Sequence, residues 1–193
     1  MPDSNRKPVD PLRADGSLRH LLTLEGLPPS VIRKLLERSE HYARPLSKAA
    51  ARSDALAGRT VAVMFAEPST RTRVSFELAA RRLGADVINI EVQLSFVLRD
   101  ADAAVPDLVA AHVSEHVSVL SGGAGSYAHP TQGLLDALTV QQHKGRIEGL
   151  RIAIVGDIKH SRVARSSWHA FAALGAAEIR IVAPSGLMPV ATS

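Results

Sequence analysis

A strand that turns sharply into a helix constrains this chain more than any other feature. Thr60–Phe65 is apolar at nearly every position, which predicts a strand buried on both faces. Residues 76–83 then carry apolar side chains at helical spacing, and Gly84 follows as the expected C-cap. Ser69 or Thr70 is the natural N-cap of that helix. The pattern therefore predicts an α/β unit in which a helix N-terminus follows the end of a strand.

The residues of this turn favour anion binding. The first turn of a helix presents unpaired N–H groups, with the positive end of the helix dipole behind them. Ser69, Thr70 and Thr72 add hydroxyl groups, and Arg71 adds a guanidinium. Together they predict a cup for a phosphate or another small anion. The alternative interpretation is an ordinary capped helix with solvated arginines.

The stretch from Phe65 to Ala85 resembles the carbamoyl-phosphate signature of the aspartate and ornithine carbamoyltransferases. Its pattern is F-x-x-x-S-T-R-T-R-x-S-F-E-x-A-A-x-R-L-G-A. The resemblance runs from about Leu18 to the last residues, with one gap. It implies an α/β fold in which a three-layer parallel-sheet carbamoyl-phosphate domain precedes an incomplete Rossmann-like second domain. It also implies that Ser69, Thr70, Arg71 and Thr72 bind the phosphate.

A second motif, His129-Pro130-Thr131-Gln132, follows a glycine-rich turn and opens a predicted helix. A neutral imidazole and a side-chain amide at a helix start can both hydrogen-bond a carbonyl oxygen. A histidine before a proline is usually only a loop residue. Here, however, the following Gly-Leu-Leu-Asp-Ala-Leu-Thr also matches the family. The resemblance implies that His129 and Gln132 act in catalysis by holding the carbamoyl group, together with Arg71.

A third motif, G-D-I-K-H-S-R-V-A-R-S at residues 156–166, resembles the aspartate branch of the family more than the ornithine branch. The resemblance implies that Arg162 binds a carboxylate of aspartate, for which a bidentate guanidinium is suited. The alternative is a surface arginine on a first helical turn, and Arg165 fits that description. Arg99 ends a predicted strand, where parallel sheets place ligand contacts, and its family counterpart binds carbamoyl phosphate.

Two stretches depart from the family. The predicted strand at residues 86–92 runs directly into strand-like residues 93–99, although parallel strands need a crossover between them. In the family, a Ser-rich loop with Lys-Gly-Glu and a helix intervene, so we infer an internal deletion. The chain also stops after one βαβ unit at residues 151–182, which cannot cover both faces of its own sheet.

These observations predict three regions. Residues 1–17 read as a flexible N-terminal arm, residues 18–149 as the carbamoyl-phosphate-binding domain, and residues 150–193 as the start of a truncated aspartate-binding domain. Further helices are expected from Pro28 to near Pro45 and over residues 107–116, 130–144 and 160–174. A short strand is expected at residues 117–120.

Composition excludes several classes of function. The chain has 193 residues and a net charge of +4, its basic residues are scattered, and only 4% of residues are aromatic. Nucleic acid is therefore not an expected partner. Without cysteine there is no disulfide and no thiolate metal site. No apolar run reaches membrane-spanning length, so a cytoplasmic protein without membrane partners is expected.

The resemblance implies transfer of the carbamoyl group from carbamoyl phosphate to the α-amine of L-aspartate, without a metal or cofactor. It also implies a homotrimer or larger assembly, with a dihydroorotase-like or regulatory subunit as a conceivable partner. The main alternative is a catalytically impaired relative or fragment that keeps the phosphate cup and serves in assembly. An unrelated α/β phosphate-binding protein is a third, remoter alternative.

A third stretch also departs from the family. Ala124 and Ser126-Tyr127 replace more polar residues that are expected just before His129.

Overall fold

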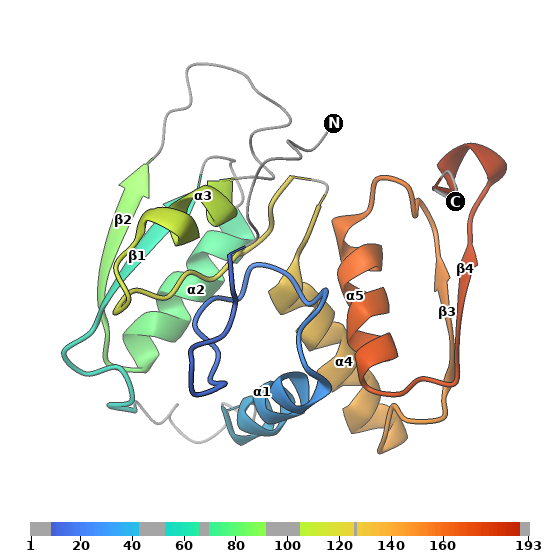
Figure 1. Cartoon of the computed structure of the whole chain (residues 1–193), viewed down its shortest axis with the longest axis horizontal. Coiled ribbons are helices and arrows are strands. Elements are labelled where there is room, and N and C mark those ends of the chain that lie inside the picture. Colours follow the sequence, from blue (N-terminus) through green and yellow to red (C-terminus); the bar gives the residue numbers. More distant parts are fainter. Residues whose placement is uncertain (1–8, 43–52, 66–69, 92–104, 126, 190–193) are drawn as a thin grey trace. The chain divides into compact units, whose positions relative to one another are not determined.

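The computed structural model describes residues 9–42, 53–65, 70–91, 105–125 and 127–189. The chain forms two compact units, one made of Met1–Ala43 with Arg99–Ser193 and the other of Arg44–Leu98 (Figure 1). The second unit is continuous in sequence and is inserted between the two parts of the first. The predicted strand at residues 96–99 lies outside the described residues.

The inserted unit is the predicted strand–helix–strand. Strand β1 (Thr60–Phe65) pairs in parallel with β2 (Asp86–Glu91), and helix α2 (Thr70–Arg82) connects them and packs against both. The predicted burial of β1 is wrong, because only Val63 is buried and Met64 is 47% exposed. Burial on both faces needs a layer on each side, and the described residues of this unit supply one helix.

The larger unit is built around two helices that lie side by side. Helix α4 (Pro130–Lys144) packs against α5 (Arg162–Ala173), and α1 (Pro29–Tyr42) contacts both. On the other side of α5, strand β3 (Arg151–Val155) pairs in parallel with β4 (Glu178–Val182) (Figure 1). Helix α3 (Val105–His112) and the 3₁₀ turn Ser185–Leu187 complete the described elements. The fully or nearly buried core residues are Leu21, Leu24, Leu27, Ile32, Leu36, Ala137, Leu138, Ile147, Ala170, Phe171 and Leu174.

Local signals in the sequence explain where α4 and α5 begin and end. Pro130 occupies the first turn of α4, where its missing N–H costs nothing. Gly145 ends α4 in the left-handed region, and its N–H donates to the Gln141 carbonyl at 2.7 Å. Ser161 caps α5, and its Oγ accepts the N–H of Ala164 at 3.1 Å. Both predicted helices are confirmed.

The predicted strand at residues 117–120 is wrong, because only a single parallel bridge forms there, between Leu120 and Leu21. The N–H of Val119 donates to Nδ1 of the buried His20 at 3.1 Å. That N–H is therefore unavailable for a ladder with a neighbouring strand.

The N-terminal segment is ordered where it is described. Residues 9–18 form a hydrogen-bonded turn in which the N–H of Arg13 donates to the Ser17 carbonyl at 2.8 Å, whereas the sequence predicted a flexible arm. The predicted domain boundary near residue 150 stays a prediction. Helices α4 and α5, which lie on either side of it in the sequence, pack together within one unit. Within the described residues, no helix is long and apolar enough to cross a membrane.

Candidate functional site

The N-terminus of α2 presents the predicted phosphate-binding residues. Thr70 is the first residue of α2, the Arg71 side chain is exposed, and Thr72 is half-buried. Ser75 Oγ donates to the Arg71 carbonyl at 2.8 Å, one turn further along the helix. The N–H groups of this turn and the Arg71 guanidinium can hold an anion. Ser69 lies outside the described residues.

His129 stands at the start of α4, in the other unit. Its backbone N–H donates to Oγ of Ser166 on α5 at 2.9 Å, which ties the helix start to its neighbour. Burial lowers the pKa of the His129 imidazole, the Arg162 charge lowers it further, and Asp136 acts in the opposite direction. The imidazole is therefore neutral at pH 7 and can donate one N–H to a carbonyl oxygen.

Arg162, the first residue of α5, faces the same place as His129. Its Nη1 donates to the Gly125 carbonyl at 2.7 Å, so the guanidinium is fixed against the glycine-rich turn. A Cβ atom on Gly123 would lie 3.4 Å from Arg162 Cζ and 3.4 Å from His129 Cδ2. The structure therefore brings the predicted carbamoyl-binding histidine and the predicted carboxylate-binding arginine to one space beside Gly123.

Gln132 lies in the first turn of α4 and is held from within the helix. Its Nε2 donates to Oδ1 of Asp136 at 2.8 Å, four residues further along. The other carboxylate oxygen of Asp136 accepts the Oγ–H of Ser167 on α5 at 2.6 Å. Asp136 thus joins a predicted site residue to the buried face of the neighbouring helix.

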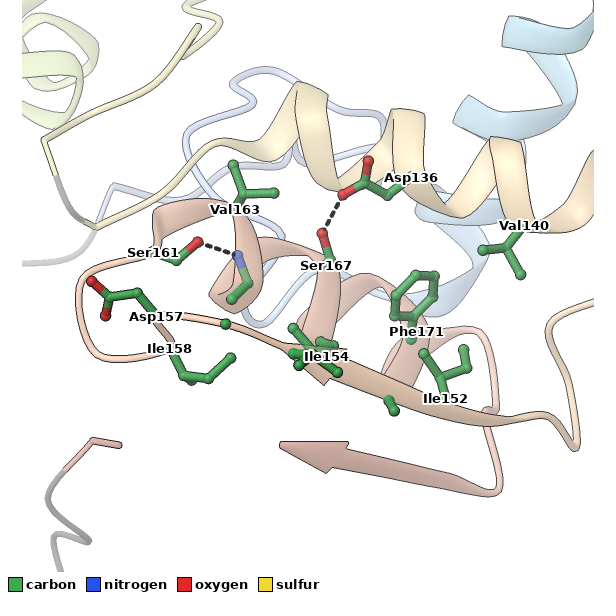
Figure 2. Close-up of a pocket in the computed structure, with 14 residues that line it drawn as sticks. Asp136, Val140, Ile152, Ile154, Asp157, Ile158, Ser161, Val163, Ser167 and Phe171 are labelled. Carbon is green, nitrogen blue, oxygen red and sulfur yellow. Dashed lines mark hydrogen bonds between the residues drawn. The ribbon is translucent and has the colours of Figure 1, made fainter. Parts of the chain in front are cut away.

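A cavity of about 430 Å³ lies beside this network, between α4, β3 and α5. Figure 2 shows Asp136 and Ser167 at its wall, joined by their hydrogen bond, with Ile152, Ile154 and Phe171 forming the apolar side. Neither His129 nor Arg162 lines this cavity. The cavity is therefore distinct from the space beside Gly123.

The structure places the predicted site residues in two separate groups. Arg71 and Thr72 belong to the inserted unit, whereas His129, Gln132 and Arg162 belong to the larger one. Arg99 lies outside the described residues. Across the described residues, no group of three or more histidine or acidic side chains is placed to hold a metal ion.

Sequence reasoning missed four residues that shape the larger unit's part of the site. Signals for some of them were present. An aspartate four residues after Gln132 is positioned for a hydrogen bond along one helix face. Two adjacent serines among the apolar positions of α5 indicate polar groups that must find partners inside the protein. The missed residues are Gly123, Asp136, Ser166 and Ser167.

Comparison with known families connects these features to an enzyme class. Residues 19–102 match the family described as aspartate/ornithine carbamoyltransferase, carbamoyl-P binding domain. This stretch of the chain is therefore similar to the carbamoyl-phosphate-binding domain of that family. The predicted resemblance is confirmed at this level.

Solved structures of carbamoyltransferases share the fold of this chain. The ornithine carbamoyltransferase from Pyrococcus furiosus has a TM-score of 0.76 and 30% identity, over 89% of this chain and 59% of that one. The catalytic subunit of M. Jannaschii aspartate transcarbamoylase has a TM-score of 0.74 and 30% identity, over 90% and 63%. The predicted α/β class with parallel strands is confirmed.

A third carbamoyltransferase structure contains ligands. It is the aspartate transcarbamoylase from Trypanosoma cruzi in complex with aspartate and phosphate, with a TM-score of 0.70 and 27% identity, over 95% of this chain and 66% of that one. Aspartate and ornithine enzymes both occur among the similar structures, so the fold does not separate the two types. The chain spans 59% and 63% of the length of the first two enzymes.

Proposed function

We propose that this chain carries the substrate-binding groups of an aspartate carbamoyltransferase. The reaction moves the carbamoyl group of carbamoyl phosphate to the α-amine of L-aspartate and gives N-carbamoyl-L-aspartate and phosphate, a step of pyrimidine biosynthesis. The supporting observation is that a neutral imidazole and a guanidinium border one space beside Gly123. An imidazole N–H suits a carbonyl oxygen, and a guanidinium suits a carboxylate.

Arg162 favours aspartate over ornithine as the acceptor. Aspartate has a second carboxylate that a fixed guanidinium attracts, whereas ornithine carries a second ammonium group that the guanidinium repels. The Arg162 side chain is already held by the Gly125 carbonyl at 2.7 Å, so little side-chain entropy is lost on binding.

The proposed mechanism is acyl transfer with an activated donor. The amine nitrogen attacks the carbamoyl carbon, the bond from that carbon to the phosphate oxygen breaks, and the departing phosphate accepts the amine proton. Arg71, Thr72 and the α2 N-terminus stabilise the growing phosphate charge, with Ser69, Thr70 and Arg99 as further proposed contacts. His129 donates to the carbonyl oxygen and polarises it, while Gln132 orients the carbamoyl group.

A comparison of two acceptors tests this proposal. Purified protein is incubated with carbamoyl phosphate and either aspartate or ornithine, and the carbamoylated product is quantified. We expect carbamoyl-aspartate and no carbamoyl-ornithine. Arg162→Ala should abolish the product. The matched variant Arg165→Ala should retain it, because Arg165 lies over the Tyr127 ring, 5.9 Å from its centroid. Carbamoyl-ornithine as the main product would refute the aspartate assignment.

A second candidate function is phosphate binding in an assembly, without turnover. It needs only the N-terminus of α2 and the exposed Arg71 side chain, which can hold an anion by themselves. In that case a ligand joining a phosphonate to an aspartate moiety should bind little better than phosphonoacetamide. A gain in affinity of several hundred-fold for the longer ligand would exclude this second candidate.

We also propose that the protein is cytoplasmic and forms a homotrimer.

The phosphate contact of Arg71 can be tested without turnover. Arg71→Ala removes a charge-assisted hydrogen bond worth roughly 1.5–3 kcal/mol, so phosphate affinity should fall by about one to two decades. Titration calorimetry with inorganic phosphate measures this loss, and Arg81→Ala in the last turn of the same helix is the control. Equal phosphate affinity in the wild type and Arg71→Ala would contradict the assignment.

A further inference from the structure

The carboxylate of Asp136 accepts two hydrogen bonds in the larger unit, one with each of its oxygens. Oδ1 accepts Nε2–H of Gln132 at 2.8 Å, and Oδ2 accepts Oγ–H of Ser167 at 2.6 Å. Ser167 is buried at 5% exposure on α5. Because Ser167 is fixed by the packing of α5 on α4, it holds Asp136 in one position.

The chemistry of this contact fixes which way the Gln132 amide faces. The carboxylate oxygen Oδ1 of Asp136 is the acceptor in this contact, so Gln132 turns its NH₂ group toward Asp136. The amide oxygen lies on the other branch of the same planar group and is directed away from Asp136. Of the two polar groups of this side chain, the amide oxygen is therefore the one that can accept a hydrogen bond from a ligand.

We propose that Asp136 is a positioning residue that makes Gln132 select a carbamoyl group by its N–H. This inference rests on the proposed function, in which the ligand at this site is a carbamoyl donor. A carbamoyl NH₂ can donate to the Gln132 oxygen, whereas an acetyl methyl group of similar size cannot. With the amide reversed, the NH₂ of Gln132 would oppose the NH₂ of the carbamoyl group.

A pair of phosphonates that differ only in this group provides the test. Phosphonoacetamide carries the NH₂ group, and acetonylphosphonate carries a methyl group in its place. Titration calorimetry gives the ratio of their dissociation constants for each variant. One neutral hydrogen bond predicts that the wild type prefers the amide by about three- to tenfold.

Asp136→Asn distinguishes positioning from packing. Asparagine has almost the same shape, but it can face Gln132 with either its oxygen or its NH₂, so the preference should fall toward onefold. A packing role alone would leave the ratio unchanged in this variant. Gln132→Ala should also give a ratio near one, which shows that the ratio reports on Gln132. Ser167→Ala removes the support of Asp136 and should lower the ratio less.

The matched control is Glu178→Gln, a carboxylate-to-amide change at a site that pairs with Arg180 instead. This variant should keep the wild-type ratio. A wild-type ratio near one, or an unchanged ratio in Asp136→Asn, would overturn the inference while leaving the proposed function intact. If neither phosphonate nor inorganic phosphate binds the wild type, the proposed function itself fails.

Discussion

Gly123 has a φ of +126°, and a side chain there would meet Arg162 and His129 at once. Gly123→Ala should therefore destabilise the fold by about 1–3 kcal/mol through its positive φ. The added methyl group would also touch both side chains and occupy part of the space between them, so ligand affinity should fall. Urea unfolding measures the first effect, and titration with a phosphonate–aspartate ligand measures the second. Gly145→Ala is the control, because its φ is also positive but its Cβ would meet nothing within 4 Å. Equal ligand affinity in both variants would contradict this account.

Single histidine residues also determine how the stability of the fold depends on pH. His20, His129 and His169 each have a pKa below the ordinary value, with burial as the main cause. Below pH about 6.5 the unfolded chain takes up protons that the folded chain does not, so stability should fall as the pH drops below that value. Urea midpoints at pH 7.5, 6.5 and 5.5 test this expectation.

His20→Asn is the informative variant for that series. It removes one titrating group and keeps a side-chain oxygen that can accept the N–H of Val119, as Nδ1 of His20 does at 3.1 Å. The decline in stability toward pH 5.5 should be shallower in this variant. A wild-type midpoint that is constant from pH 7.5 to 5.5 would show that burial of these rings does not perturb their titration.

Among the elements, helix α5 depends on its N-cap residue, Ser161, for part of its stability. Ser161→Ala removes the hydrogen bond from the Ala164 N–H and should cost about 0.5–2 kcal/mol of unfolding free energy. Ser39→Ala in α1 of the same unit should be nearly neutral, because Ser39 Oγ donates to the Leu35 carbonyl, which already belongs to the same helix. Thermal unfolding of both variants gives the comparison. Similar losses in the two would argue against the cap.

The elements also show what the sequence could predict. Helix α4 (Pro130–Lys144) has its predicted bounds, because hydrophobic period, the proline at its start and the glycine after its end are local signals. The burial of β1 was predicted incorrectly, because burial depends on which other elements pack there. Likewise, His129 and Arg162 were found as separate motifs, but their meeting beside Gly123 depends on how α4 and α5 pack.

At the scale of the whole molecule, the sheet formed by β3 and β4 exposes apolar side chains to solvent. Val155 is 73% exposed, Val182 48% and Ile181 37%. Exposed apolar groups on a two-stranded sheet favour association, so we expect the chain to self-associate at micromolar concentration. Sedimentation velocity should show this, and Val155→Lys should shift the distribution toward monomer. A well-folded wild-type monomer at that concentration would contradict the expectation and weaken the proposed trimer.

The core of the larger unit joins residues that the ribosome makes far apart in time. Ile32 and Leu36 of α1 pack in one cluster with Ala137 and Phe171, and the inserted unit lies between them in the sequence. At about 5–20 residues per second, roughly a hundred residues of synthesis separate the two sides by about 5–20 seconds. During that interval the residues against which α1 packs have not yet been synthesised. The nascent chain therefore exposes the apolar face of α1, to which a chaperone can bind.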